Sequence, residues 1–330
     1  MPELPEVETI RRGLAPALEG ASFTKVELRR RDLRFPFPRG FAKRLEGAKV
    51  MSLSRRAKYL VAELDTGEAL IMHLGMTGRF AIEEGVAGRK ERFEPGRFYD
   101  DSERLAVHDH VVFHLSTGRR LVYNDVRRFG FMSLTKLSEV EAHPLFKGLG
   151  IEPIGNEFGA DALARLFAGK ARPLKSALLD QRLVAGLGNI YVSEALFRAG
   201  LSPRRPATTL AGKGTLARAR REALAEAIRC VLAEAIDKGG STLRDYAKAD
   251  GERGAFQHEF RAYGREGEVC VRPGCRGIVA RLVQSGRSTF FCRVCQKGEA
   301  DAENVAAADL RSRREPPPPC TSGARKPRGI

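Results

Sequence analysis

The chain has 330 residues, enough for two or three domains with their own cores. It carries 57 Lys and Arg against 41 Asp and Glu, a formal net charge of +16 that indicates a polyanionic partner. No apolar run reaches the roughly 20 residues that span a bilayer, and the acidic first residues are unlike a secretory signal, so we expect a cytoplasmic protein with no membrane partner. Six cysteines, four of them close together, favour reduced thiols and a metal over a disulfide scaffold.

The chain opens MPELPEVETI. If Met1 is removed, the new terminus is the secondary amine of Pro2, an unusual nucleophile. The alternative is that Pro5 lies in the first turn of a helix, where its missing N–H costs nothing. Apolar residues do recur at helical spacing, at Val7, Ile10, Leu14 and Leu18. This stretch alone favours the helix start, and both interpretations stay open.

Short runs that alternate apolar and polar residues follow, at 23–30, 58–64, 68–74, 110–115 and 119–124. Such closely spaced runs predict an antiparallel sandwich or barrel. Residues 81–107 contain Gly, Pro and many charges, which predicts a long surface loop. Alternation would put His108 and His110 on one strand face without a third ligand, so we expect no histidine metal site there.

The apolar period becomes helical from about residue 156. One face of a long helix is marked by Leu224, Ile228, Val231 and Ala235. Residues 298–330 are rich in Pro and charge and include PPPP at 316–319, so we predict a disordered tail.

The strongest local motif is a set of four cysteines, Cys270-x4-Cys275-x16-Cys292-x2-Cys295. Four thiolates at this spacing can surround one tetrahedral Zn²⁺, and a site with no open position is structural. Arg287 lies just before the second pair, where a metal-held hairpin could present it to a phosphate; the alternative is a solvated arginine.

Seven motifs together resemble bacterial formamidopyrimidine-DNA glycosylases, in the family's order: PELPEVE, RRAKYL, HLGMTG, RRFG, LVAGLGNIYVSEALFRAGLSP, YGREGE and CRVCQK. The resemblance implies an α+β multidomain fold. Its parts would be an N-terminal antiparallel β-sandwich with a terminal helix at 1–134, a helix–two-turn–helix domain at 135–255, a zinc-finger hairpin at 256–298 and the tail at 299–330.

The same resemblance implies a bifunctional glycosylase and abasic-site lyase of base excision repair. It would excise 8-oxoguanine and formamidopyrimidines from double-stranded DNA, cleave abasic sites by β,δ-elimination, act as a monomer and carry one structural Zn²⁺. The catalytic residues that it implies are Pro2 as Schiff-base nucleophile, Glu3 as general acid, Lys58 and Arg287. The residues that it places on DNA are Met76, His108, Arg127, Phe129, Lys170 and Asn189.

Met76, Arg127 and Phe129 match the residues with which the family fills the gap left by an extruded base; core packing is the alternative for Met76 and Phe129. Val126 stands where the family usually has Pro, which predicts a less rigid turn before Arg127. Residues 239–246 would form the loop that closes over the base.

Two other functions remain open at this point. A related branch of glycosylases removes oxidised pyrimidines, although its opening and wedge differ from PELP and RRF. A catalytically silent zinc-finger protein that binds DNA would also account for the charge and the finger, but not for Pro2 and Glu3 at the terminus.

Overall fold

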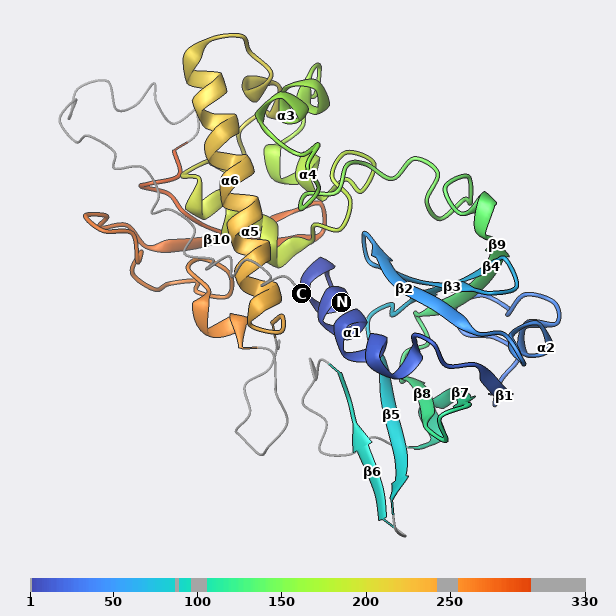
Figure 1. The fold of residues 1–330 in the computed structure, drawn as a ribbon. Helices are drawn as coiled ribbons and strands as arrows, with labels where there is room; N and C mark the ends of the chain where they lie inside the picture. The colour runs from blue at the N-terminus through green and yellow to red at the C-terminus, as the bar shows by residue number, and fades with distance from the viewer. Residues whose placement is uncertain (1, 87–88, 96–105, 242–254, 298–330) are drawn as a thin grey trace, which may run out of the picture. The chain divides into compact units, whose positions relative to one another are not determined.

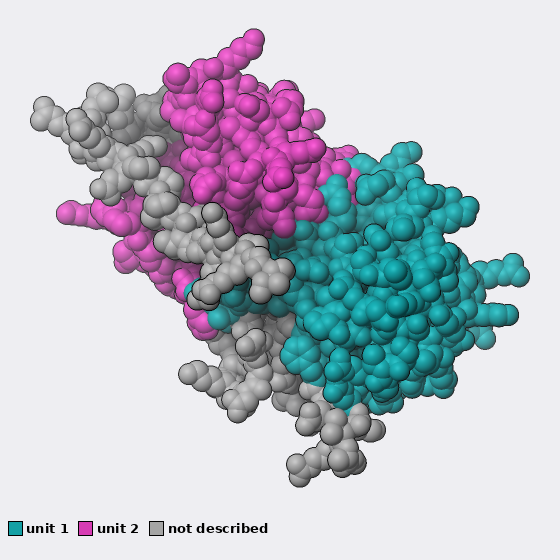
Figure 2. All heavy atoms as spheres, in the orientation of Figure 1, with its two compact units in different colours: residues 1–148, 236–257 teal, residues 149–235, 258–330 magenta. Residues whose placement is uncertain are grey.

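The structure is a computed structural model that describes residues 2–86, 89–95, 106–241 and 255–297 (Figure 1). It divides into two compact units (Figure 2). Unit 1 comprises residues 1–148 and 236–257, and unit 2 comprises residues 149–235 and 258–330.

Unit 1 begins with helix α1 (Leu4–Leu18), which has Pro5 in its first turn. The predicted stripe is confirmed, because Val7, Ile10, Leu14 and Leu18 are all buried. A proline in the first turn and an apolar residue at every third or fourth position are sufficient to explain the helix.

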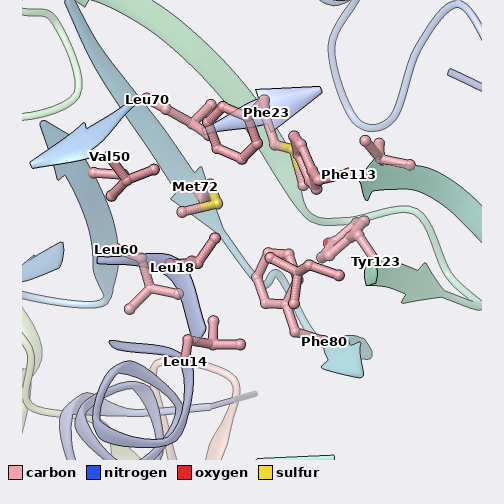
Figure 3. Packing of buried hydrophobic residues seen from close by; sticks show 14 of the residues in the cluster. Leu14, Leu18, Phe23, Val50, Leu60, Leu70, Met72, Phe80, Phe113 and Tyr123 are labelled. Atoms are coloured by element: carbon pink, nitrogen blue, oxygen red, sulfur yellow. The ribbon is translucent and has the colours of Figure 1, made fainter. Parts of the chain in front are cut away.

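Two antiparallel sheets form the body of unit 1. The five-stranded sheet has the order β1 (Phe23–Leu28), β7 (Asp109–Leu115), β8 (Arg120–Asp125), β5 (Gly78–Val86) and β6 (Arg89–Phe93). The four-stranded sheet has the order β2 (Val50–Arg56), β3 (Tyr59–Leu64), β4 (Glu68–His73) and β9 (Phe131–Lys136). One hydrophobic core joins them with α1 and the short α2 (Phe41–Leu45), and Figure 3 shows side chains from both sheets meeting in it. The predicted sandwich is confirmed.

The predicted loop at 81–107 is wrong in its first half. β5 runs on to Val86 and pairs with β6, with Ile82 opposite Phe93. The outer strand of this hairpin, β6, is the edge of the five-stranded sheet, and a charge-rich sequence is common in edge strands. His108 also lies outside the expected strand, in a short 3₁₀ helix at Ala106–His108.

Unit 2 is helical up to the finger, as predicted. Its helices are α3 (Ala160–Phe167), α4 (Leu174–Leu179), α5 (Asn189–Arg198) and most of α6 (Thr215–Asp237), with a 3₁₀ turn at Ala207–Leu210. Two further 3₁₀ turns lie at Leu137–Glu139, in unit 1, and at Phe256–Glu259, where the chain passes from unit 1 to unit 2. The predicted face of α6 is fully buried at Leu224, Ile228, Val231 and Ala235. β10 (Val279–Gln284) and β11 (Arg287–Cys292) form the finger hairpin. Within the described ranges, no helix is long and apolar enough to cross a membrane.

Candidate active site

The start of α1 is buried and firmly held. Pro2 and Glu3 are both buried directly before the helix. The amide nitrogen of Glu3 donates to Oε2 of Glu6 at 2.8 Å. The other carboxylate oxygen of Glu6 accepts from the backbone nitrogen and the hydroxyl of Ser241, at 2.9 and 3.0 Å. Glu6, which no motif singled out for a role, therefore joins the helix start to residue 241; the predicted covering loop beyond it, at 242–246, lies outside the described residues.

Lys58 lies in the two-residue turn between β2 and β3, next to Ala57, whose φ is 52°. Only 7% of Lys58 is exposed, so this lysine is buried although it lies in a turn. Arg55 donates to the carbonyl of Ala57 at 2.8 Å and pairs with Glu8 of α1 at 3.3 Å. These contacts fasten the Lys58 turn to the helix that carries the predicted nucleophile.

His73, at the end of β4, has a pKa well below its ordinary value. Burial, with added repulsion from Lys58 and Arg34, lowers its pKa to about 4. Its Nδ1 accepts from the amide of Gly75 at 3.1 Å, which requires that nitrogen to be unprotonated. The neutral ring thus supports the turn that carries Met76.

The three predicted gap-filling residues lie on two turns of unit 1. Met76 is half-buried between β4 and β5, whereas Arg127 and Phe129 are exposed between β8 and β9. The guanidinium of Arg127 lies 4.6 Å from the centroid of the Phe129 ring. Core packing is therefore wrong for Phe129, which is 42% exposed.

His108 is half-buried, and its ring centroid lies 6.4 Å from that of His110. His110 is buried and donates from Nε2 to the carbonyl of Asp125 at 2.9 Å. The two histidines thus differ in exposure and role, and in the described part of the chain the group of residues that could hold a metal consists of the four finger cysteines.

In unit 2, Asn189 contacts the residue that follows Arg287. Asn189 is the first residue of α5 and donates from Nδ2 to the carbonyl of Ser288 at 3.0 Å. Arg287 is exposed at the first position of β11, after a turn in which Ser285 and Gly286 have φ of 51° and 71°. Such a two-residue turn fits the twist of a tight hairpin.

Lys175 was missed by the sequence analysis and contacts the same strand. Its buried ammonium donates to the Ser288 carbonyl at 2.9 Å and to the Thr289 hydroxyl at 2.6 Å. Lys170 instead follows α3, where its backbone bonds to Phe167 and Thr208. The one available signal for Lys175 was its place directly after Leu174 in the largely apolar sequence of α4.

The finger cysteines converge on one point, with all four Sγ atoms within 4.8 Å of one another. The Sγ atoms of Cys270 and Cys295 are 3.8 Å apart, and those of Cys275 and Cys292 are 3.7 Å apart. A tetrahedron with Zn–S bonds of about 2.3 Å has edges of about 3.8 Å, so the thiols fit zinc. Because burial raises the pKa of Cys270 to about 11, a thiolate at this position needs a cation.

Gly277 shows how tightly the finger is built. A Cβ atom there would lie 2.6 Å from Sγ of Cys292, and the Gly277 amide donates to Sγ of Cys275 at 3.4 Å. Position 277 therefore requires glycine, because it lies beside two of the four cysteines that would bind zinc.

Comparisons with known proteins place the chain. Residues 1–132 match the family model of the formamidopyrimidine-DNA glycosylase N-terminal domain, and residues 149–247 match that of the formamidopyrimidine-DNA glycosylase H2TH domain. Residues 267–298 match the zinc finger found in FPG and IleRS. The chain belongs to the formamidopyrimidine-DNA glycosylase family. The family resemblance, the α+β fold class and the zinc finger predicted from the sequence are confirmed.

Curated relatives match this glycosylase along nearly their whole length. The formamidopyrimidine-DNA glycosylase of Beijerinckia indica is 62% identical over 297 residues, which is 90% of this chain and 100% of the relative. That of Methylobacterium nodulans is 60% identical over 297 residues, covering 90% and 99%.

Solved structures of the family have the same fold. The Lactococcus lactis Fpg, in complex with an abasic site containing DNA, is 33% identical with a TM-score of 0.72 over 90% of this chain and 100% of that one. The MutM (FPG) protein of Thermus thermophilus is 40% identical with a TM-score of 0.70, over 90% and 99%.

Proposed function

We propose that this member of the family is a bifunctional DNA glycosylase and abasic-site lyase that excises oxidised purines, using Pro2 as nucleophile and Glu3 as general acid. The observation that carries the proposal is the buried Pro2–Glu3 pair, held at the start of α1 by the Glu6 carboxylate. A structural helix start would need the cap but not a proline immediately before it.

The chemistry follows from a secondary amine. With Met1 removed, the Pro2 nitrogen attacks C1′ of the damaged nucleotide and the base leaves. Glu3 protonates the sugar oxygen as the ring opens, which gives an iminium ion. The iminium draws electrons from the C2′–H bond, so the proton is lost and the 3′-phosphate leaves by β-elimination; a second elimination releases the 5′-phosphate. Hydrolysis of the iminium then frees Pro2.

The protonation state of the Pro2 amine determines whether it can attack C1′. A terminal α-amine has a pKa near 7.7–8.0 in model peptides, so about a tenth or more is free base at neutral pH. Burial and, to a smaller extent, the charges of Lys58 and Arg34 depress the pKa of His73 in unit 1. A similar field at Pro2 would raise its free-base fraction.

Phosphate contacts would come from both units of the chain. In unit 1, Lys58 binds a phosphate and donates a proton during β-elimination, and His108 contacts the DNA backbone. In unit 2, Asn189 at the positive end of α5 and the exposed Arg287 bind phosphate, and Arg287 assists δ-elimination. Lys170 is the remaining DNA contact.

The three gap-filling residues act after the damaged base leaves the stack. Met76 plugs the space, Phe129 wedges between neighbouring bases, and the Arg127 guanidinium pairs with the orphaned base. The exposure of Arg127 and Phe129 supports this assignment. The Phe129 ring is 42% exposed, so its burial contributes little to the stability of the folded protein.

The finger cysteines Cys270, Cys275, Cys292 and Cys295 would hold one Zn²⁺, which supplies rigidity to the hairpin and no step of the reaction. We further propose that the protein acts as a monomer in the bacterial cytoplasm, where the chromosome lies. The domain boundaries at 134, 255 and 298 belong to the same proposal.

Single-turnover excision tests this function directly. Duplexes that contain 8-oxoguanine opposite cytosine should lose the base and be cleaved faster than duplexes that contain thymine glycol. Preference for thymine glycol would favour the pyrimidine branch, and tight binding without release of any base would favour the silent DNA-binding protein.

A further inference from the structure

Two turns that carry the gap-filling residues lie at the same corner of the sandwich. The turn at 74–77 crosses from β4 to β5, and the turn at 126–130 crosses from β8 back to β9. The strand pairs on either side are in register, His73 with Phe131 and Gly78 with Asp125. The turns themselves lie outside the ladders, so other contacts must fix their tips.

A buried carboxylate supplies those contacts. Asp125 has no exposed surface, and its Oδ1 accepts from the hydroxyl of Thr77 at 2.5 Å. Its Oδ2 accepts from the amide of Gly130 at 2.8 Å and from the hydroxyl of Tyr123 at 3.2 Å. Burying a carboxylate without hydrogen-bond donors costs free energy, so the three donors stabilise the Asp125 side chain, and the side chain in turn fixes the three donors.

The Thr77 hydroxyl extends the network to the second turn. While it donates to Asp125, it accepts from the backbone nitrogen of Arg127 at 3.0 Å. One hydroxyl on the Met76 turn therefore fixes the backbone of the residue that would pair with the orphaned base. The Arg128 amide also donates to the Asp125 carbonyl, at 3.3 Å.

The two turns also touch through their backbones. A Cβ atom on Gly75, whose φ is +62°, would lie 2.2 Å from the carbonyl carbon of Phe129. A Cβ on Gly130 would lie 1.8 Å from the hydroxyl of Tyr123, and one on Gly78 would lie 2.3 Å from it. Glycine at these three positions permits the close approach that the hydrogen bonds require.

We propose that Thr77, Tyr123 and Asp125 form a positioning latch that makes the Met76 turn and the Arg127–Phe129 turn move as one rigid unit. The inference rests on the proposed function, since it assigns the latch to the residues that fill the gap. Its consequence is selectivity: Arg127 can discriminate between opposite bases only if its backbone is fixed before it enters the duplex. The latch residues are positioning residues, and none needs to touch DNA.

The test is Thr77→Val, which preserves shape and removes the hydroxyl. Excision of 8-oxoguanine opposite cytosine should fall about tenfold, as expected for one hydrogen bond to a buried charge, and the advantage of cytosine over adenine should shrink with it. Borohydride trapping at a preformed abasic site, where little extrusion is needed, should stay within about twofold of the unmodified rate. Thr77→Ser restores the hydroxyl and should restore selectivity.

Thr24→Val is the matched control, because it removes a hydroxyl that is hydrogen-bonded to the backbone of the neighbouring strand in the same sheet. It should change neither excision nor selectivity. Asp125→Asn should reproduce the Thr77→Val phenotype if it folds.

Amide hydrogen exchange separates failure of the latch from failure of the proposed function. In the free protein, Thr77→Val should speed exchange at Arg127 and Gly130 while strands away from this corner keep their protection. Unchanged exchange at these amides, an unchanged cytosine preference, or equal loss of excision and abasic-site trapping would overturn the latch. Failure of the unmodified protein to release 8-oxoguanine would instead overturn the proposed function, whatever the exchange result.

Discussion

Arg127 is the residue on which the choice of opposite base depends. Its guanidinium can donate to two neighbouring acceptors of an orphaned cytosine, O2 and N3, whereas adenine presents a single acceptor, N1, on the same edge. A good bidentate contact discriminates by about 1–3 kcal/mol, or roughly ten- to a hundredfold, so excision opposite cytosine should exceed excision opposite adenine by at least the lower factor. Arg127→Ala should lose most of this preference and still form a Schiff base at an abasic site.

Single-turnover rates on duplexes with each of the four opposite bases measure this preference. Arg128→Ala is a suitable control, because Arg128 is an exposed neighbour on the same turn. Equal rates opposite cytosine and adenine in the unmodified protein would remove Arg127 from the role assigned to it.

His73 gives a prediction about pH. Because its pKa in the folded protein is depressed to about 4 from the ordinary 6.5, the unfolded chain binds the proton more readily. Its stabilising contribution is therefore complete above pH 6.5 and is lost as pH falls from 6.5 toward 4. An NMR titration should show a neutral His73 ring at pH 5.5, and His73→Gln should flatten the pH dependence of unfolding in that window. A ring that titrates near 6.5 would contradict the burial and charge assigned to this corner.

At the scale of elements, the finger hairpin should depend wholly on its metal. Cys292→Ser removes a buried ligand, and Gly277→Ala drives a methyl group to within 2.6 Å of that same sulfur. Both variants should lose zinc and affinity for DNA while unit 1 stays folded, because its core is built from other residues. Val283→Ala, which changes an exposed side chain of β10, should keep its zinc. Elemental analysis that finds no metal in unmodified protein purified without chelator would rule out the zinc site.

Elements with a strong period could be predicted from the sequence, and those formed by distant partners could not. The stripe of α1, the alternation in β3 and β7 and the cysteine spacing each lie within a short window. The β5–β6 hairpin was missed because its charge-rich sequence is typical of a loop. The pairing of β6 with β5 nevertheless gives these residues backbone hydrogen bonds at the edge of the sheet.

The same distinction applies to the candidate site. Pro2, Glu3 and the cysteines could be proposed from motifs, but the contacts that position them depend on residues far apart in the sequence. Thr77 and Asp125 are separated by 48 positions, and Lys175 and Ser288 by 113. No local pattern reveals such a hydrogen bond before the fold brings its partners together.

The charge of the whole molecule predicts how it binds undamaged DNA. With a net charge of +16, binding to a plain duplex should be mainly electrostatic. Each neutralised phosphate contributes about 0.9 to the log–log dependence of affinity on salt, so a slope of several units is expected. Titrations at a series of salt concentrations measure this slope, and affinity that is insensitive to salt would contradict a phosphate-based interface.

By the proposed mechanism, the Pro2 nitrogen forms the covalent bond to DNA. Borohydride added to the protein and a duplex containing 8-oxoguanine should trap an adduct, and mass spectrometry of the digested adduct should place the sugar on the peptide that begins at Pro2. Pro2→Gly should weaken trapping, and a tag retained before Pro2 should abolish it. The absence of an adduct from a protein with a verified Pro2 terminus, or an adduct located on Lys58, would contradict the assignment of Pro2 as the nucleophile.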